Sequence, residues 1–154
     1  MAISQAAGTE IIRSASFEHV NDGDGTPLII GVVHHIYTVL SVSIYHDTIG
    51  TSTGTYQMFL VGFDAYGGTS AQDINILKQT VGVAGSTFVW NDKYSFNGCE
   101  PDWSSPHTGP MTTAAEQTAI AAQGTTTSQV LKLKSSAGGN YFDIHITFID
   151  QNNE

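Results

Sequence analysis

The alternation of apolar and polar residues predicts β-strands along most of the chain. The pattern is clearest in 140–150, where apolar residues recur at every second position: Phe142, Ile144, Ile146 and Phe148. In 130–136, Leu131 and Leu133 alternate with lysines in the same way. A period of two places one set of side chains on a buried face and the other toward solvent. Turn-forming residues separate these segments from further strand patterns at 10–20, 74–83 and 86–96.

The longest apolar run, 28–46, changes face part of the way along. After Gly31 the apolar residues Val33, Tyr37 and Val39 occupy odd positions, and then Leu40, Val42 and Ile44 occupy even ones. A shift of one residue exchanges the two faces of a strand. We therefore predict two strands, or one bent strand, with the switch near 39–40.

The segment 56–66 carries apolar residues on both faces of its predicted strand. Met58 and Leu60 lie on one face, and Phe59 and Val61 on the other. This pattern predicts a sheet that is covered on both sides, by a second sheet or by a neighbouring subunit.

The segment "STFVWNDKYSF" (86–96) predicts a hairpin that contains a cluster of aromatic residues. A three-residue loop, 91–93, would form two aromatic cross-strand pairs, Trp90 with Tyr94 and Phe88 with Phe96. A two-residue loop at 91–92 is the alternative and would form neither pair. With the longer loop, these four aromatic side chains are expected in the core or in a subunit interface.

The segment 98–128 interrupts the strand pattern. It begins with the proline-rich "GCEPDWSSPHTGP" and continues with "MTTAAEQTAIAAQG", which is the helix candidate of the chain, with Thr113 and Glu116 as a capping box. The whole pattern predicts an all-β fold, an antiparallel, jelly-roll-like β-sandwich with one long loop insertion and at most a short helix. We expect an N-terminal arm at 1–9 and a single domain at 10–154.

Composition narrows the choice of partners. Only 12% of the residues are charged, and 14 acidic against 5 basic residues give a net charge of −9. Such a surface repels phosphate groups, so neither nucleic acid nor an anionic membrane is expected as a partner. The single cysteine excludes an internal disulfide and a site of several thiolates. We expect no signal peptide, and no apolar stretch of the sequence is long enough to cross a membrane.

Parts of the sequence resemble small β-sandwich structural proteins of tailed bacteriophages. The resemblance covers 35–97 and 129–150, through "IYTVLSVSIYH", "INILKQTVGVAGSTFVWNDKYSF" and "LKLKSSAGGNYFDIHITFID", whereas 98–128 departs from it as an insertion. It implies a virion part, either a capsid decoration (cement) protein or a tail or fibre component. The matching residues are Gly85, Ser86, Thr87, Asn91, Asp92, Lys93, Leu131, Leu133, Ser135, Ser136, Ala137 and Asp150.

Histidines supply one candidate for chemistry. On a strand, His34 and His35 would point to opposite faces, so a zinc site would need a further ligand such as His145 or Asp143. Histidines that are hydrogen-bonded or half-exposed are the favoured interpretation. We expect no metal and no cofactor.

Two other motifs are weaker candidates. "NDGDG" (21–25) begins like a calcium loop, but position 33, where the final glutamate would fall, is Val33. A turn is the better interpretation. Cys99 and His107 would form a nucleophilic pair only if the loop brought them within hydrogen-bonding distance, so an unreactive thiol is expected.

Our leading hypothesis is a non-enzymatic bacteriophage virion structural protein, a capsid decoration (cement) protein that stabilises the capsid exterior. It would self-associate, as a homotrimer expected from the symmetry axes of capsids. Its partners would be further copies of itself and the major capsid protein or tail proteins. Its location would be the virion, assembled in the host cytoplasm.

Two alternatives remain from the sequence. The first is a tail or fibre component that binds a host receptor or surface glycan through exposed residues of the insertion: Asp102, Trp103, Ser104 and His107. The second is a small metal-dependent enzyme of the cupin or lyase kind, which would require bound metal.

Overall fold

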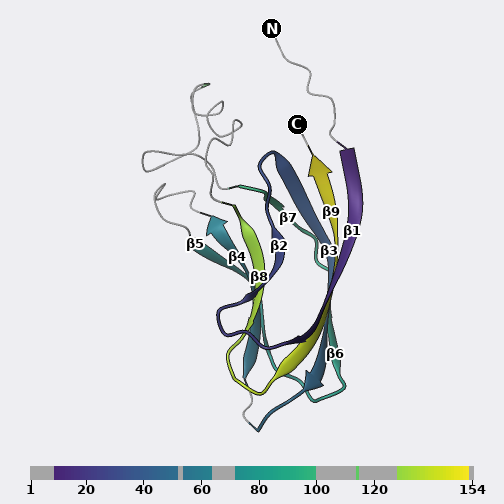
Figure 1. Cartoon of the computed structure of the whole chain (residues 1–154), viewed down its shortest axis with the longest axis vertical. Coiled ribbons are helices and arrows are strands. Elements are labelled where there is room, and N and C mark those ends of the chain that lie inside the picture. Colours follow the sequence, from purple (N-terminus) through teal and green to yellow (C-terminus); the bar gives the residue numbers. More distant parts are fainter. Residues whose placement is uncertain (1–8, 52–53, 64–71, 100–113, 115–127, 153–154) are drawn as a thin grey trace.

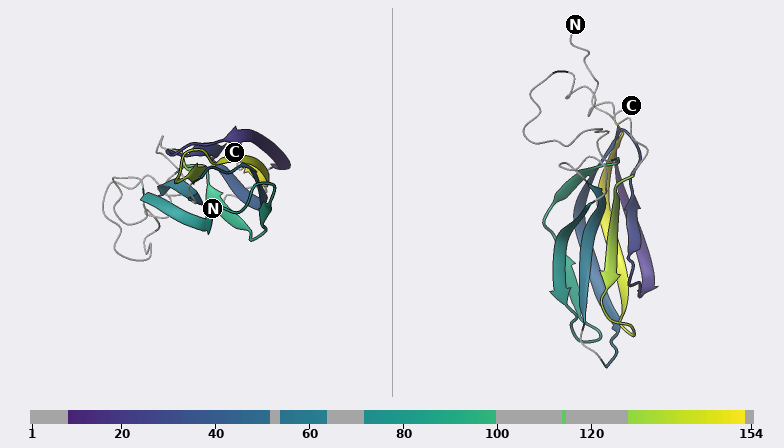
Figure 2. Two further views of the ribbon diagram at one scale, coloured as in Figure 1. Left: turned by 90° about the horizontal axis from the view of Figure 1, so that it is seen from below. Right: turned by 90° about the vertical axis from the view of Figure 1, so that its left-hand side faces the viewer.

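The computed structural model describes residues 9–51, 54–63, 72–99, 114 and 128–152. Within these residues nine strands form two antiparallel sheets that pack face to face, as Figures 1 and 2 show. The all-β sandwich predicted from the sequence is confirmed. The strands are β1 (Thr9–Val20), β2 (Thr26–Ile30), β3 (His35–Thr48), β4 (Thr55–Phe63), β5 (Gln72–Thr80), β6 (Thr87–Trp90), β7 (Tyr94–Asn97), β8 (Val130–Ser135) and β9 (Tyr141–Asn152).

The strand order is that of a jelly roll. One sheet runs β1-β9-β3-β6, with β7 also paired to β3, and the other runs β2-β8-β4-β5. The chain therefore crosses between the sheets after β1, β2, β3, β5, β7 and β8. Two antiparallel sheets connected in this way make the double Greek key of jelly-roll proteins.

Apolar side chains from the inner faces of both sheets form the core. In β9, Phe142, Ile144 and Ile146 are at most 1% exposed, and in β8 Leu131 and Leu133 are equally buried. The alternation predicted at 130–136 and 140–150 is thus confirmed. The remaining core residues come mainly from β3 and β4.

The long run at 28–46 contains both of the features expected of it. The chain leaves β2 in one sheet, turns at 31–34 and enters β3 in the other. Within β3 the pairing with β9 shifts between Val39 and Ser41. This bulge changes the buried set from Tyr37 and Val39 to Val42 and Ile44, which places the predicted switch at 39–40.

Phe59, on the outer face of β4, is covered by the chain itself. Phe59 is 3% exposed although it points away from the core cluster. The Nζ atom of Lys134 lies 4.6 Å from the centre of its ring, and a Cβ atom added to Gly25 would lie 3.0 Å from the ring. Lysine stems can cover apolar surface in this way while the charge stays in water. In this structure a loop and a neighbouring strand, rather than a further sheet, cover Phe59.

The hairpin predicted at 86–96 is wrong. β6 and β7 do not pair with each other but follow one another along the same edge of β3, with Trp90 opposite Val42 and Tyr94 opposite Val39. Asn91, Asp92 and Lys93 fall between them and interrupt the strand. The residues at 91–93 favour a turn, but both flanking segments pair with the long strand β3 instead of with each other. The expected aromatic pairs therefore do not form across a hairpin.

The two ends of the sandwich differ. At one end, backbone hydrogen bonds join the connections between the sheets, among them Val81 N–H to the carbonyl of Gly54 (2.9 Å) and Ser136 N–H to that of Thr55 (2.8 Å). At the other end, β1 begins opposite the end of β9, with Thr9 paired to Asn152. Figure 1 shows that residues 98–99 and 128–129 lie at this second end as well, which we call the terminal end.

Candidate functional site at the terminal end

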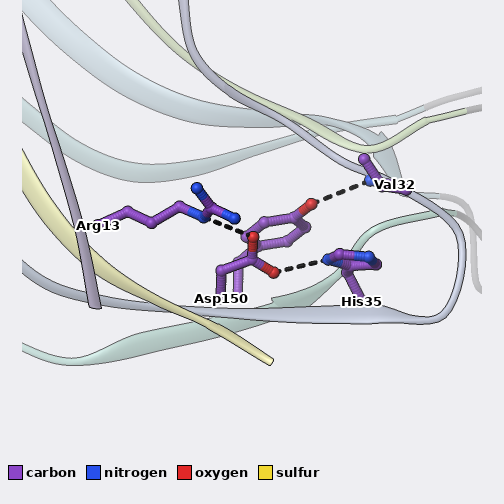
Figure 3. A network of polar contacts seen from close by, with 5 residues as sticks. Arg13, Val32, His35 and Asp150 are labelled. Carbon is purple, nitrogen blue, oxygen red and sulfur yellow. Dashed lines mark hydrogen bonds and ion pairs between the residues drawn. The ribbon is translucent and has the colours of Figure 1, made fainter. Parts of the chain in front are cut away.

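A buried carboxylate joins three strands at the terminal end. Asp150 on β9 is 7% exposed, because it continues the inward-facing alternation of that strand. Its Oδ2 atom accepts a hydrogen bond from Arg13 Nε on β1 at 2.9 Å, and its Oδ1 atom accepts one from His35 Nδ1 on β3 at 2.6 Å (Figure 3). We call these three residues the terminal triad.

The terminal triad also affects the pKa of the adjacent residue Tyr37. The Tyr37 hydroxyl accepts a hydrogen bond from Val32 N–H at 3.2 Å. Burial raises the pKa of Tyr37, and the negative charge of Asp150 raises it further. Both carboxylate oxygens of Asp150 are engaged, so the geometry ties β1, β3 and β9 together rather than presenting a base to a substrate.

The base of the 98–128 segment lies next to the terminal triad. Gly98 N–H donates to the carbonyl of His35 at 2.9 Å, Gln129 N–H to that of Gly98 at 2.9 Å, and Gly31 N–H to that of Gln129 at 2.8 Å. Cys99 and Ser128 form an isolated antiparallel bridge. These contacts hold both ends of the segment in fixed positions, and we call them the loop base.

The loop base requires glycine because the backbones approach closely. A Cβ atom at Gly31 would lie 2.1 Å from the carbonyl oxygen of Gly98, and one at Gly98 would lie 1.7 Å from that of Val32. Gly62 has φ 91°, and a Cβ atom there would lie 2.7 Å from the carbonyl oxygen of Ser128. Side chains cannot be accommodated at such distances.

The aromatic residues singled out from the sequence line the core. Phe96 is 6% exposed, and Phe88, Trp90 and Tyr94 are half-buried against the core cluster. The four side chains therefore lie in or against the core of this chain, and the pairs they form differ from those predicted. The proposed glycan-binding residues Asp102, Trp103, Ser104 and His107 lie outside the described residues, as do Thr113 and Glu116 of the helix candidate.

The candidate histidines do not come together. His34 lies in the turn before β3 with φ 63°, so it is not on a strand as expected, and His35 belongs to the terminal triad. His145 is hydrogen-bonded to Ser16 at 2.8 Å on the outer face of the sheet. Across the part of the chain that the structure describes, no group of three or more His, Cys, Asp or Glu side chains is placed to hold a metal ion.

His46 is part of the core. It is 2% exposed, and its ring meets the rings of Tyr56 and Phe142 edge-on at 5.4 and 5.5 Å. Its Nδ1–H donates to the carbonyl of Ser86 at 2.9 Å, whereas Nε2 has no hydrogen-bond partner among the described residues. This histidine joins β3 to the turn before β6.

The remaining motifs have structural roles. The Asp22 carboxylate accepts a hydrogen bond from Asp24 N–H at 2.8 Å, which is the turn that the sequence favoured. Cys99 is 4% exposed within the loop base.

No helix in the described residues is long and apolar enough to cross a membrane.

The outer face of the sheet β1-β9-β3-β6 carries pairs of short hydroxyl side chains among its other residues. Ser14 lies 3.3 Å from Thr147 across β1 and β9, and Thr38 lies 2.9 Å from Ser95 across β3 and β7. A shallow depression of about 240 Å³ adjoins these pairs. It is lined mainly by Ser16, Glu18, Ser43, Tyr45, Asp143 and His145.

The stability of the core is expected to fall at alkaline pH. Burial raises the pKa of Tyr56 from 10.0 to about 12, so above pH 10 the unfolded chain loses this proton before the folded chain does. Stability from this group is therefore complete below pH 10 and is lost between pH 10 and 12, by up to roughly 2 to 3 kcal/mol. Urea unfolding from pH 8 to 12 measures it. Tyr56→Phe should flatten the profile, and an unchanged slope would contradict the assignment.

Comparisons with known proteins leave the family open. No protein-family model and no curated protein matches the chain. Among solved structures, a chain from Bacillus endospore appendages, described as forming "a novel family of disulfide-linked pili", is 10% identical with a TM-score of 0.45. The match covers 100% of this chain and 97% of the other. At this TM-score the likeness bears on neither fold nor function.

Proposed function

We propose that the chain is a non-enzymatic structural subunit that self-associates and decorates the exterior of a bacteriophage capsid. The observation that carries the proposal is the outer sheet face with its pairs of hydroxyl side chains, such as Ser14 with Thr147 and Thr38 with Ser95. Short uncharged side chains lose little rotamer entropy on contact and cost less to remove from water than charges. Such a face suits broad contact with other protein.

The polar clusters at the terminal end support the same function. The terminal triad and the loop base use their hydrogen bonds to hold strands and turns in place. A rigid scaffold that presents its connecting segments at one end is what a subunit of a larger assembly needs. The resemblance to phage β-sandwich proteins supplies the virion location, and the symmetry of capsids supplies the expected trimer.

The proposal predicts an oligomer in solution and binding to capsids. Light scattering over a concentration series should give three times the chain mass of 16.4 kDa, or a multiple of that mass where trimers associate further. The purified chain should also co-sediment with heads of the phage whose genome encodes it, and it should raise their disruption temperature. A protein that stays monomeric and leaves the heads unbound would contradict the proposal.

A further inference from the structure

We propose that β1 is a contact surface for a second copy of this chain, which pairs with it antiparallel across a two-fold axis and extends the sheet. The inference rests on the proposed self-association but not on the virion location. It names the strand and the register that the self-association would use. A contact of this kind gives an even number of subunits, so it would pair two chains or join two trimers.

The first argument comes from comparing the edges of the two sheets. Native sheets protect exposed edges with short strands, prolines, charges or bulges. β2 has five residues and contains Pro27, β6 and β7 have four residues each, and β5 carries Asp73 and Lys78 and pairs irregularly with β4. Each of these edges has at least one such protection.

β1 carries Glu10, Arg13 and Glu18, but it is longer than these edge strands and more regularly paired. Nine successive residues, from Thr9 to Phe17, pair in unbroken register with β9. β1 pairs with no other strand in the described part of the chain, and Figure 1 shows it at the outer edge of its sheet. Its backbone therefore presents a regular row of unpaired groups.

The side chains of this edge also favour an interface. The basic residue of the regular stretch, Arg13, directs its Nε atom to Asp150 on the neighbouring strand of its own sheet. Ile11 and Ile12, which directly precede Arg13 in β1, are 45% and 70% exposed. An edge that exposes two isoleucines, and whose arginine is hydrogen-bonded to the neighbouring strand, is open to strand pairing.

The occupant follows from the register that self-pairing allows. A two-fold axis perpendicular to the sheet keeps the outward-facing residues of both copies on the same face of the extended sheet. The residue that lies at the axis is then paired with the same residue of the second copy. With Ile12 on the axis, the two exposed Ile12 side chains pack together and Glu10 faces Ser14. Ile11 then lies opposite Arg13, whose stem offers it apolar contact.

The registers centred on residues 13, 14 and 15 are less favourable. An axis through residue 13 would place Arg13 against itself, and an axis through residue 14 would place Glu10 against Glu18. Like charges directly opposite each other destabilise a sheet. An axis through residue 15 would place Ile12 against Glu18 and extend the pairing into the irregular part of β1 after Phe17. The self-complementary register at Ile12 is what favours a second copy over a strand of another protein.

The test replaces the residue on the axis. Ile12→Lys places two ammonium groups opposite each other, and the site is exposed enough to accept the substitution without disturbing the fold. Light scattering should show a loss of pairing, with at least ~100-fold weaker association. Val83→Lys, at a residue that is 75% exposed, is the matched control and should pair as the unsubstituted chain does.

A second variant tests the register directly. Ile12→Cys should form a disulfide-linked dimer on mild oxidation, seen on a non-reducing gel, whereas Val83→Cys and the unsubstituted chain should not. If the unsubstituted chain is monomeric at every concentration, self-association and the β1 contact are both wrong. If it associates but Ile12→Lys has no effect and Ile12→Cys does not cross-link, the β1 contact is wrong and the proposed function stands.

Discussion

Gly98→Ala is expected to destabilise the fold by at least about 3 kcal/mol, because a Cβ atom at position 98 would lie 1.7 Å from the carbonyl oxygen of Val32. The backbone cannot move away without losing the hydrogen bond from Gly98 N–H to His35. Moving the other way would break the bond that Gln129 N–H donates to Gly98. Equilibrium unfolding in urea measures the free energy of unfolding.

A matched substitution separates this steric effect from the general effect of replacing glycine. A Cβ atom added to Gly138 would meet no atom within 4 Å, and the φ angle of this residue is not positive. Gly138→Ala should leave the stability unchanged or raise it by roughly 0.4 to 1 kcal/mol, through the smaller entropy of the unfolded chain. A Gly98 variant as stable as the Gly138 variant would show that the loop base can open without cost.

The loop base explains why the large insertion is compatible with the jelly roll. Its two ends are held against each other and against the turn at 31–34 by three backbone hydrogen bonds. The positions of β7 and β8 in the core are therefore fixed by the loop base and do not depend on the residues between its two ends. Long insertions between fixed points cost little additional loop entropy.

Local alternation predicted the strands that line the core. In β8 and β9 the sequence period of two matches the burial pattern from Val130 to Ser135 and from Phe142 to Asp150. Even the bulge in β3 was visible, as a change from odd to even apolar positions near 39–40. These features depend on neighbouring residues, so the sequence alone contains them.

The pairing of strands that are distant in the sequence could not be predicted from the local alternation of residues. The sequence of 86–96 favoured a hairpin, but its two halves pair with β3, about fifty residues earlier in the chain. The pairing of β1 with β9 joins the two ends of the described chain and likewise has no local signal. Only the jelly-roll order of the whole molecule brings these strands together.

The terminal triad was missed although a signal for it exists. Asp150 continues the buried positions of β9 after Phe148, and Arg13 falls on the same face of β1 as Ala15 and Phe17. A carboxylate in phase with a buried face needs a partner that donates hydrogen bonds. With 5 basic residues in the chain, Arg13 was one of few possible partners.

Asp150→Asn is expected to lower the free energy of unfolding by about 2 to 3 kcal/mol, because it removes the charge that Arg13 and His35 share. The loss should be smaller than for a fully buried pair, since the Arg13 side chain is 51% exposed and can reach water. Urea unfolding measures the loss. In a double-mutant cycle with Arg13→Ala, the two losses should not add, and simple additivity would contradict the ion pair.

The same variant has a second readout that a general loss of packing would not produce. The negative charge of Asp150 contributes to the raised pKa of Tyr37, so Asp150→Asn should lower that pKa toward its ordinary value. Absorbance titration of the tyrosines, with Tyr37→Phe to identify the signal, tests this. A loss of stability with no change in the Tyr37 titration would mean that Asp150 acts through packing alone. A change in both would show that the charge of Asp150 contributes to the stability of the terminal end and also to the pKa of Tyr37.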